Sequence, residues 1–185
     1  MTIPNPTRSN NTVKNMTSFC RMSFELSRDS GRVHPLGLCY RGHPILNNET
    51  KMDLQAIHDL AVEAAQEAGA AIRRFYKDSY TIRDKGEDNP VTDADLAANA
   101  ILEKRLRGAF PEAGWLSEES VDDPERLECA GCWIVDPLDG TREFTMGIPQ
   151  FCVSVAFVLD GEAVVGVLYN PIAEELFTGI VGVGA

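Results

Sequence analysis

Apolar residues recur at the spacing of an α-helix from position 54 onward, and this pattern predicts a long amphipathic helix. Its apolar positions are Leu54, Ile57, Ala61, Ala64, Ala65, Ala68, Ile72 and Phe75. A second helix is expected over residues 93–107, because Thr92 followed by Asp95 has the pattern of a capping box and Pro111 lies beyond the expected end. A loop rich in Gly, Asn and Pro precedes this helix at residues 85–90.

The hydrophobic period then drops to two, which is typical of half-buried strands. Strands are expected at residues 80–83, 115–117, 132–135, 151–159, 162–169 and 176–181. Two helices followed by a largely antiparallel sheet indicate an α+β fold in which layered helices pack on the sheet. Residues 179–185 end in apolar, strand-like sequence, so we expect that the chain is cut short of its full fold.

Charge is distributed unevenly along the 185 residues, whose net charge is −11. Residues 1–51 are predicted to be a disordered extension, with a transit peptide as the alternative, and residues 52–185 to be the folded domain. The acidic body argues against binding to nucleic acid or to an anionic membrane. No stretch has the apolar length of a membrane span. An anionic substrate would need a bound divalent metal to screen its charge.

Five cysteines form an odd and scattered set, which indicates a reducing compartment and a cytoplasmic location. Cys129 and Cys132 make a lone C-x-x-C motif. A zinc site would need two more ligands nearby, and none pairs with this motif. Ordinary thiols ahead of a strand are therefore favoured over zinc binding or redox chemistry.

The most informative segment runs from Trp133 to Phe144 and reads WIVDPLDGTREF. A buried strand is expected to lead into Asp136, and a turn containing proline to separate this residue from Asp139. Two carboxylates so close together repel each other unless a cation lies between them. The Leu138 carbonyl would add a hard oxygen ligand, and a set of oxygen donors favours magnesium. The alternative is structural, with Asp136 capping the strand end and Asp139 capping a helix.

Gly140 and Thr141 are expected to open a short helix directly after these acids. Amide groups at a helix start suit a phosphate, and Gly140 lets the backbone approach a ligand closely. Two further segments contain acids. Taken alone, LSEES at residues 116–120 would be a solvated pair of acids, and PVTDAD at residues 90–95 would be a helix cap.

Together and in this order, the three motifs NPVTDAD (89–95), LSEES (116–120) and WIVDPLDGT (133–141) resemble those of the inositol monophosphatase family. That family includes inositol phosphatases, 3′(2′),5′-bisphosphate nucleotidases and relatives of fructose-1,6-bisphosphatase. The likeness covers residues 52–185, and the third motif is the most specific of the three. It implies the first, α+β domain of an inositol monophosphatase-like fold.

The resemblance implies a magnesium-dependent phosphomonoesterase, with two or three ions in the complete enzyme. Glu118, Asp136 and the Leu138 carbonyl would hold one ion, and Asp136 and Asp139 would share a second. Asp95 would orient Thr141, so that this pair and Glu118 form the catalytic set. The remaining implied roles are a phosphate cradle at Asp139, Gly140, Thr141 and Arg142, and a family lysine near Lys85.

The implied reaction is in-line displacement at phosphorus by a metal-activated water. The implied substrate is a small phosphate ester, either 3′-phosphoadenosine 5′-phosphate or inositol monophosphate, and Arg142-Glu143-Phe144 favours the nucleotidase branch. Lithium sensitivity and a homodimer are also implied. Family members carry a second domain with another metal-binding aspartate, which is not found here. The isolated chain is therefore expected to be weakly active or inactive.

Three rival interpretations were weighed against this one. A haloacid-dehalogenase-type phosphatase uses D-x-D-x-T, and here the acids lie one residue further apart. A calcium loop over residues 136–143 has the wrong ligand spacing and length. A catalytically weak or dead, truncated metal-binding remnant of the same family stays open. The three histidines, His34, His43 and His58, lie outside all the motifs.

Overall fold

The structure is a computed structural model that describes residues 53–78, 80–84 and 90–185. The extension expected at residues 1–51 and the lysine expected near the site, Lys85, lie outside the described residues. Within them, no helix is both long enough and apolar enough to cross a membrane.

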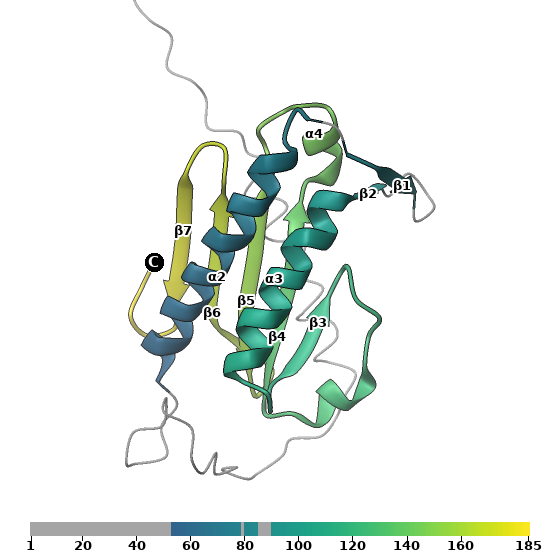
Figure 1. The fold of residues 1–185 in the computed structure, drawn as a ribbon. Coiled ribbons are helices and arrows are strands. Elements are labelled where there is room, and N and C mark those ends of the chain that lie inside the picture. Colours follow the sequence, from purple (N-terminus) through teal and green to yellow (C-terminus); the bar gives the residue numbers. More distant parts are fainter. Residues whose placement is uncertain (1–52, 79, 85–89) are drawn as a thin grey trace, which may run out of the picture. The chain divides into compact units, whose positions relative to one another are not determined.

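Two helices form one layer of the fold, as the sequence predicts. Helix α2 (Leu54–Phe75) begins at Asp53, whose side chain accepts hydrogen bonds from the amides of Gln55 and Ala56. Helix α3 (Asp93–Ala109) begins at Thr92 with the predicted capping box. Five alanines on the buried side of α2 let the two helices pack closely, because alanine projects little beyond the backbone. The two helices lie side by side across one face of a sheet (Figure 1).

The sheet is mixed, with one parallel pair and otherwise antiparallel neighbours. Its strands are β3 (Gly114–Ser117), β4 (Gly131–Asp139), β5 (Cys152–Leu159), β6 (Glu162–Asn170) and β7 (Glu175–Ile180), in this spatial order. Only β3 and β4 run parallel. A separate hairpin pairs β1 (Ile82–Asp84) with β2 (Pro90–Thr92). The largely antiparallel α+β architecture is therefore confirmed.

The core lies between the helices and the sheet. Trp133 on β4 and Phe157 on β5 are fully buried and contact each other edge to face, with ring centroids 4.7 Å apart. At the other side, a side chain at Gly69 of α2 would come within 2.7 Å of the Tyr169 ring on β6. Glycine at this helix position therefore lets α2 lie directly on the aromatic ring.

Two details of the sheet differ from expectation. Strand β4 does not end at residue 135 but continues to Asp139, which pairs with Cys152 of β5. The register slips between Asp136 and Asp139, and such an irregularity accommodates Pro137, which cannot donate to a regular ladder. The short first strand lies at Ile82–Asp84 rather than at residues 80–83, because it pairs with β2.

Two short helices complete the fold. The 3-10 helix η1 (Pro124–Glu128), which the sequence pattern did not predict, precedes β4 and begins at Asp123. Helix α4 (Thr141–Thr145) follows β4 directly and packs against β2, near the start of α3 (Figure 1). The carboxyl end of β4 therefore lies beside the amino end of α3.

Candidate active site

The parallel pairing of β3 and β4 brings the first two predicted acids together. Ser117 pairs with Val135 in register, and the amide of Glu118 donates to the Val135 carbonyl at 3.3 Å. Glu118 and Asp136 follow this pair along the two segments, so they lie side by side where β3 ends and β4 continues. Glu118 is exposed, whereas Asp136 is only 7% exposed.

The pKa of Asp136 is raised well above its ordinary value, first because the carboxyl is buried and then because Glu118 and Asp139 place negative charge beside it. A hydrogen bond between the Glu118 and Asp136 side chains adds to this rise. Burial and the charge of Glu118 also raise the pKa of Asp139. The negative charges of Glu118 and Asp139 therefore lie close to the Asp136 carboxyl group and disfavour its ionised form.

The backbone around these acids turns sharply at Gly140. This residue has φ of +99° and stands at the N-cap position of α4 without any side-chain cap. A side chain there would come within 2.9 Å of the Gln150 carbonyl and 3.0 Å of Phe151 Cβ. Only glycine fits this left-handed turn without strain. The alternative in which Asp139 caps a helix is therefore wrong.

Thr141 and Asp95, which are 46 positions apart in the chain, meet directly. The Thr141 hydroxyl lies 2.9 Å from Asp95 Oδ1 and 3.0 Å from the Leu138 carbonyl, and it can donate to either. Asp95 Oδ2 accepts from the amide of Thr92 at 2.8 Å and from its hydroxyl at 2.5 Å. Asp95 is only 1% exposed, so these bonds hold its carboxylate rigidly.

Burial raises the pKa of Asp95, while hydrogen bonds from Thr92 and Thr141 oppose this rise. The capping box of α3 therefore does more than start a helix. One oxygen of Asp95 closes the box and the other reaches the start of α4. The sequence motif alone predicts only the first of these contacts.

The predicted donors consist of three carboxylates and the Leu138 carbonyl, and their chemistry fits Mg²⁺ better than a softer metal. Among the described residues, no three His, Cys, Asp or Glu side chains form a ready-made metal site. The Asp136 carboxylate instead accepts from the Leu138 amide at 3.1 Å. A cation would neutralise the negative charge that raises the pKa values of Asp136 and Asp139, so the residues fit the ion by charge and donor type.

The C-x-x-C motif lies at the opposite end of β4. The Cys129 thiol contacts the Glu125 carbonyl at 3.7 Å, and the Cys132 thiol contacts the Trp133 carbonyl at 3.4 Å. Burial raises the pKa of Cys132 to about 11 and also raises that of Cys129. Both thiols are therefore protonated near neutral pH, which favours their interpretation as ordinary cysteines.

Other predicted residues lie apart from this cluster. Arg142 is exposed on the first turn of α4. His58 is on the first turns of α2, where its ring contacts Gln55 and Asp59. The sequence interpretation missed Asn99, a buried residue that hydrogen-bonds to Ser117 and Ser120 on either side of Glu118 and Glu119. A polar residue in an otherwise apolar helix face was the signal available for it.

Other solved structures share this arrangement of helices and sheet. The suhB protein of Bartonella henselae is 40% identical with a TM-score of 0.64, over 69% of this chain and 50% of that one. An IMPase/NADP phosphatase solved with Mg²⁺ and phosphate is 24% identical with a TM-score of 0.64, over 71% of this chain and 50% of that one. At that identity the second likeness concerns the fold alone.

The chain belongs to the inositol monophosphatase family, whose model matches residues 53–185. Inositol monophosphatase 2 of Solanum lycopersicum is 42% identical over 69% of this chain and 49% of its own length. The 3′(2′),5′-bisphosphate nucleotidase CysQ of Aggregatibacter actinomycetemcomitans is 37% identical over 77% of this chain and 51% of its own length. The chain thus spans about half the length of these relatives. The family assignment excludes the haloacid-dehalogenase alternative.

Proposed function

We propose that the protein hydrolyses a small phosphate monoester with the help of bound Mg²⁺. The observation that carries this proposal is the convergence of three carboxyl groups from two parallel strands, where Glu118 and Asp139 raise the pKa of the buried Asp136. A group of acids in this state has a strong electrostatic reason to bind a cation.

We assign the ligands from the resemblance of the three motifs to those of the family. Glu118, Asp136 and the Leu138 carbonyl would hold one ion, and Asp136 and Asp139 would share a second. When bound, Mg²⁺ acidifies water, neutralises phosphate charge and stabilises the leaving oxygen. Asp136 belongs to both ligand sets, and it is also the most buried of the three acids. Its position within the paired strand β4 would keep both sets in place.

Thr141 and Asp95 would then orient the attacking water and accept a hydrogen bond from it. Thr141 can donate its hydroxyl hydrogen to Asp95 Oδ1, which lies 2.9 Å away. In this orientation the Thr141 oxygen presents a lone pair that accepts a hydrogen from water. The two bonds from Thr92 fix Asp95 in place, so the acceptor direction of Thr141 is set before substrate arrives.

The start of α4 would receive the phosphate. The left-handed turn at Gly140 brings the backbone round to Thr141 directly beside Asp139. The first amides of a helix have no partner within it, and Arg142 adds a cation on the same turn. Asp139, Gly140, Thr141 and Arg142 would together form the phosphate cradle.

Two substrate classes follow from the names of the relatives, inositol monophosphates and 3′(2′),5′-bisphosphate nucleotides. The sequence Arg142-Glu143-Phe144 leads us to favour 3′-phosphoadenosine 5′-phosphate. Inhibition by Li⁺, a homodimer and a cytoplasmic location stay predictions from the same resemblance.

Phosphate release from 3′-phosphoadenosine 5′-phosphate and from inositol 1-phosphate tests the proposal. Both are measured with and without Mg²⁺, and with Asp136→Asn as the control. We expect weak, Mg²⁺-dependent release from the nucleotide, which Asp136→Asn abolishes. Mg²⁺ binding without release from either ester would favour a metal-binding remnant, and release that does not need Mg²⁺ would contradict the proposal.

A further inference from the structure

We infer that Asn99 is a positioning residue for the metal ligand Glu118, and this inference rests on the proposed function. Asn99 lies on α3, one helical turn after Asp95, and its side chain touches neither of the predicted ligand sets. It contacts instead the two serines that flank the turn carrying Glu118. The direction in which Glu118 leaves the sheet is therefore set from α3.

Both ends of the Asn99 amide are used. Asn99 Oδ1 accepts from the Ser117 hydroxyl at 2.7 Å, and Asn99 Nδ2 donates to the Ser120 hydroxyl oxygen at 3.1 Å. The turn itself closes with the Ser120 amide donating to the Ser117 carbonyl at 3.3 Å. The Asn99 side chain thus forms hydrogen bonds with both ends of the segment from Ser117 to Ser120.

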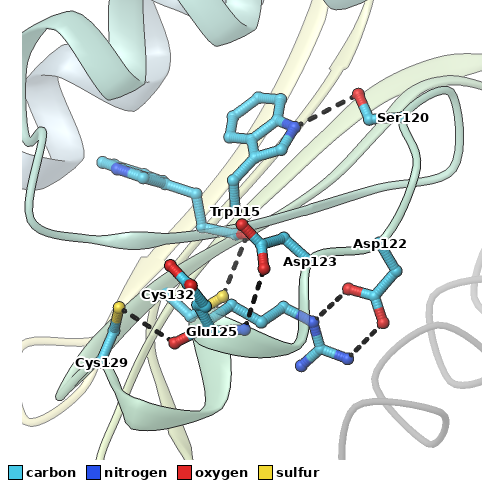
Figure 2. A network of polar contacts seen from close by, with 9 residues as sticks. Trp115, Ser120, Asp122, Asp123, Glu125, Cys129 and Cys132 are labelled. Atoms are coloured by element: carbon cyan, nitrogen blue, oxygen red, sulfur yellow. Dashed lines mark hydrogen bonds and ion pairs between the residues drawn. The ribbon is translucent and has the colours of Figure 1, made fainter.

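The other hydrogen bonds of the two serines indicate which atom donates in each contact with Asn99. Ser117 Oγ already accepts from the Glu119 amide at 3.2 Å, so its hydrogen goes to Asn99 Oδ1. Ser120 Oγ also accepts from Trp115 Nε1 at 3.4 Å (Figure 2). In this arrangement Asn99 accepts at one end and donates at the other, and aspartate cannot supply the donated bond.

Burial makes these hydrogen bonds restrictive. Asn99 is 8% exposed and Ser117 is 5% exposed, so a lost bond cannot be replaced easily by water. Asn99 and Asp95 are the two polar residues on the buried face of α3, where Ala98 and Leu102 are fully buried. A polar side chain in such a place is costly unless all its bonds are made, so the geometry of the turn is held closely.

Through Asp95 and Asn99, helix α3 contacts both the start of α4 and the turn after β3. Asp95 holds Thr141 at the start of α4, and Asn99, four residues later, holds the turn after β3. Residues four apart lie on the same helix face. The separation between Glu118 and the turn at residues 136–141 is therefore fixed by the rigid α3 as well as by the sheet.

The test is Mg²⁺ binding by the 185-residue chain, measured by calorimetry with the metal alone. The variants are Asn99→Ala, Asn99→Asp and the milder Ser120→Ala. Leu102→Ala is the matched control, because it disturbs the buried face of the same helix without touching the turn. Hydrogen exchange of the Glu119 amide, in each variant, reports on the turn without depending on the metal.

We expect Asn99→Ala to raise the Kd for Mg²⁺ by about tenfold, the lower end of what residues supporting a metal ligand cost. Asn99→Asp should weaken it as well, since it loses the donor to Ser120. Exchange of the Glu119 amide should become faster in both, while Leu102→Ala lowers Tm and leaves Kd within about twofold of wild type.

The outcomes separate the two proposals. Wild-type binding that Asp136→Asn abolishes, together with unchanged Kd in the Asn99 variants, overturns the positioning role and leaves the proposed function standing. Absence of any Mg²⁺ binding by the wild-type chain overturns both. Should Asn99→Ala fail to fold, Ser120→Ala decides: a raised Kd supports the inference and an unchanged Kd overturns it.

Discussion

Acidic residues cluster ahead of β4 and at its far end, and the surroundings of the two clusters shift the pKa values in opposite directions. Ahead of the strand, Asp122 forms a two-pronged ion pair with Arg126 at 2.6 and 3.0 Å (Figure 2). Asp123 accepts the Glu125 amide and so begins η1. The hydrogen bond with Arg126 lowers the pKa of Asp122. The charge of Asp122 is thus compensated within the chain.

At the far end, Asp136 is buried and Asp139 is partly buried, and the pKa values of both are raised by burial and by the charge of Glu118. The surroundings therefore favour the ionised form of aspartate ahead of β4 and disfavour it at the far end of the strand. This difference separates the acids with a structural role from those that we propose to bind a cation. Acid content along the sequence does not distinguish the two groups.

The largest effect should come from Asp136→Asn, which removes the carboxylate that both ligand sets share. We expect Mg²⁺ affinity to fall by about 100-fold or more, at or above the upper end of what a supporting residue costs. The metal-free chain should also become more stable, because a buried charge beside two others is lost. Calorimetry with Mg²⁺ and thermal melting without it measure the two effects.

The matched variant at the other end is Asp122→Asn, which breaks the ion pair with Arg126. It should leave Mg²⁺ affinity unchanged and lower the free energy of unfolding by no more than about 1 kcal/mol, because the Asp122 side chain is half exposed. Equal losses of Mg²⁺ binding in both variants would show that the two ends do not differ as described.

The next effect concerns the backbone at the acidic turn. Gly140→Ala should lower the free energy of unfolding by about 1–3 kcal/mol, because alanine is strained at φ of +99° and its Cβ would meet Gln150 and Phe151. The control is Gly108→Ala in α3, where a Cβ meets nothing within 4 Å. That change should raise the free energy of unfolding by about 0.5–1 kcal/mol. Urea unfolding of both variants checks the contrast, and a neutral Gly140→Ala would refute it.

A smaller effect is expected from pH. The pKa values of Asp136, Asp139 and Asp95 lie above the ordinary 3.8 in the folded chain, so the folded state binds more protons than the unfolded one. Stability from these groups is therefore full below pH 3.8 and is lost as the pH rises through the folded values. Asp122, whose pKa is lowered, contributes in the opposite sense.

Mg²⁺ should offset this loss once the carboxylates are ionised. The rise in Tm caused by Mg²⁺ should thus be larger at about pH 8 than at about pH 5. Melting curves with and without Mg²⁺ across this range test it. A rise in Tm that shrinks with increasing pH would contradict the assignment of these acids.

The smallest effect should come from the cysteines. Cys129→Ser and Cys132→Ser should leave the Kd for Mg²⁺ within about twofold, because these protonated thiols belong to the structural end of β4. Alkylation of either thiol at neutral pH should be slow for the same reason. Bound zinc in the purified chain, lost in both variants, would overturn this interpretation.

Much of the fold could be predicted from local patterns. The alanine-rich face of α2, the capping box at Thr92 and Asp95, and the hairpin at Asp160 all depend on residues close together in the sequence. The continuation of β4 to Asp139 could not be predicted in this way. It depends on pairing with Cys152, and Pro137 on its own indicates the end of a strand.

The candidate site divides along the same line. The acids at positions 118, 136 and 139 form recognisable motifs, so they could be proposed from sequence. The contact between Thr141 and Asp95 spans 46 positions and was implied only by the resemblance to the family. The contacts of Asn99 with the two serines were not implied by any motif. Sequence patterns thus identify residues that bind a ligand more readily than residues that hold those in place.

The in-register parallel pairing of Ser117 with Val135 has a practical consequence for protein engineering. The link between β3 and β4 can be lengthened without moving either acid, because the pairing of the strands sets their alignment. Val121, which is 96% exposed within that link, is thus a suitable insertion point for an epitope tag or a fluorescent reporter. A single residue added inside either strand would instead turn one acid to the opposite face of the sheet.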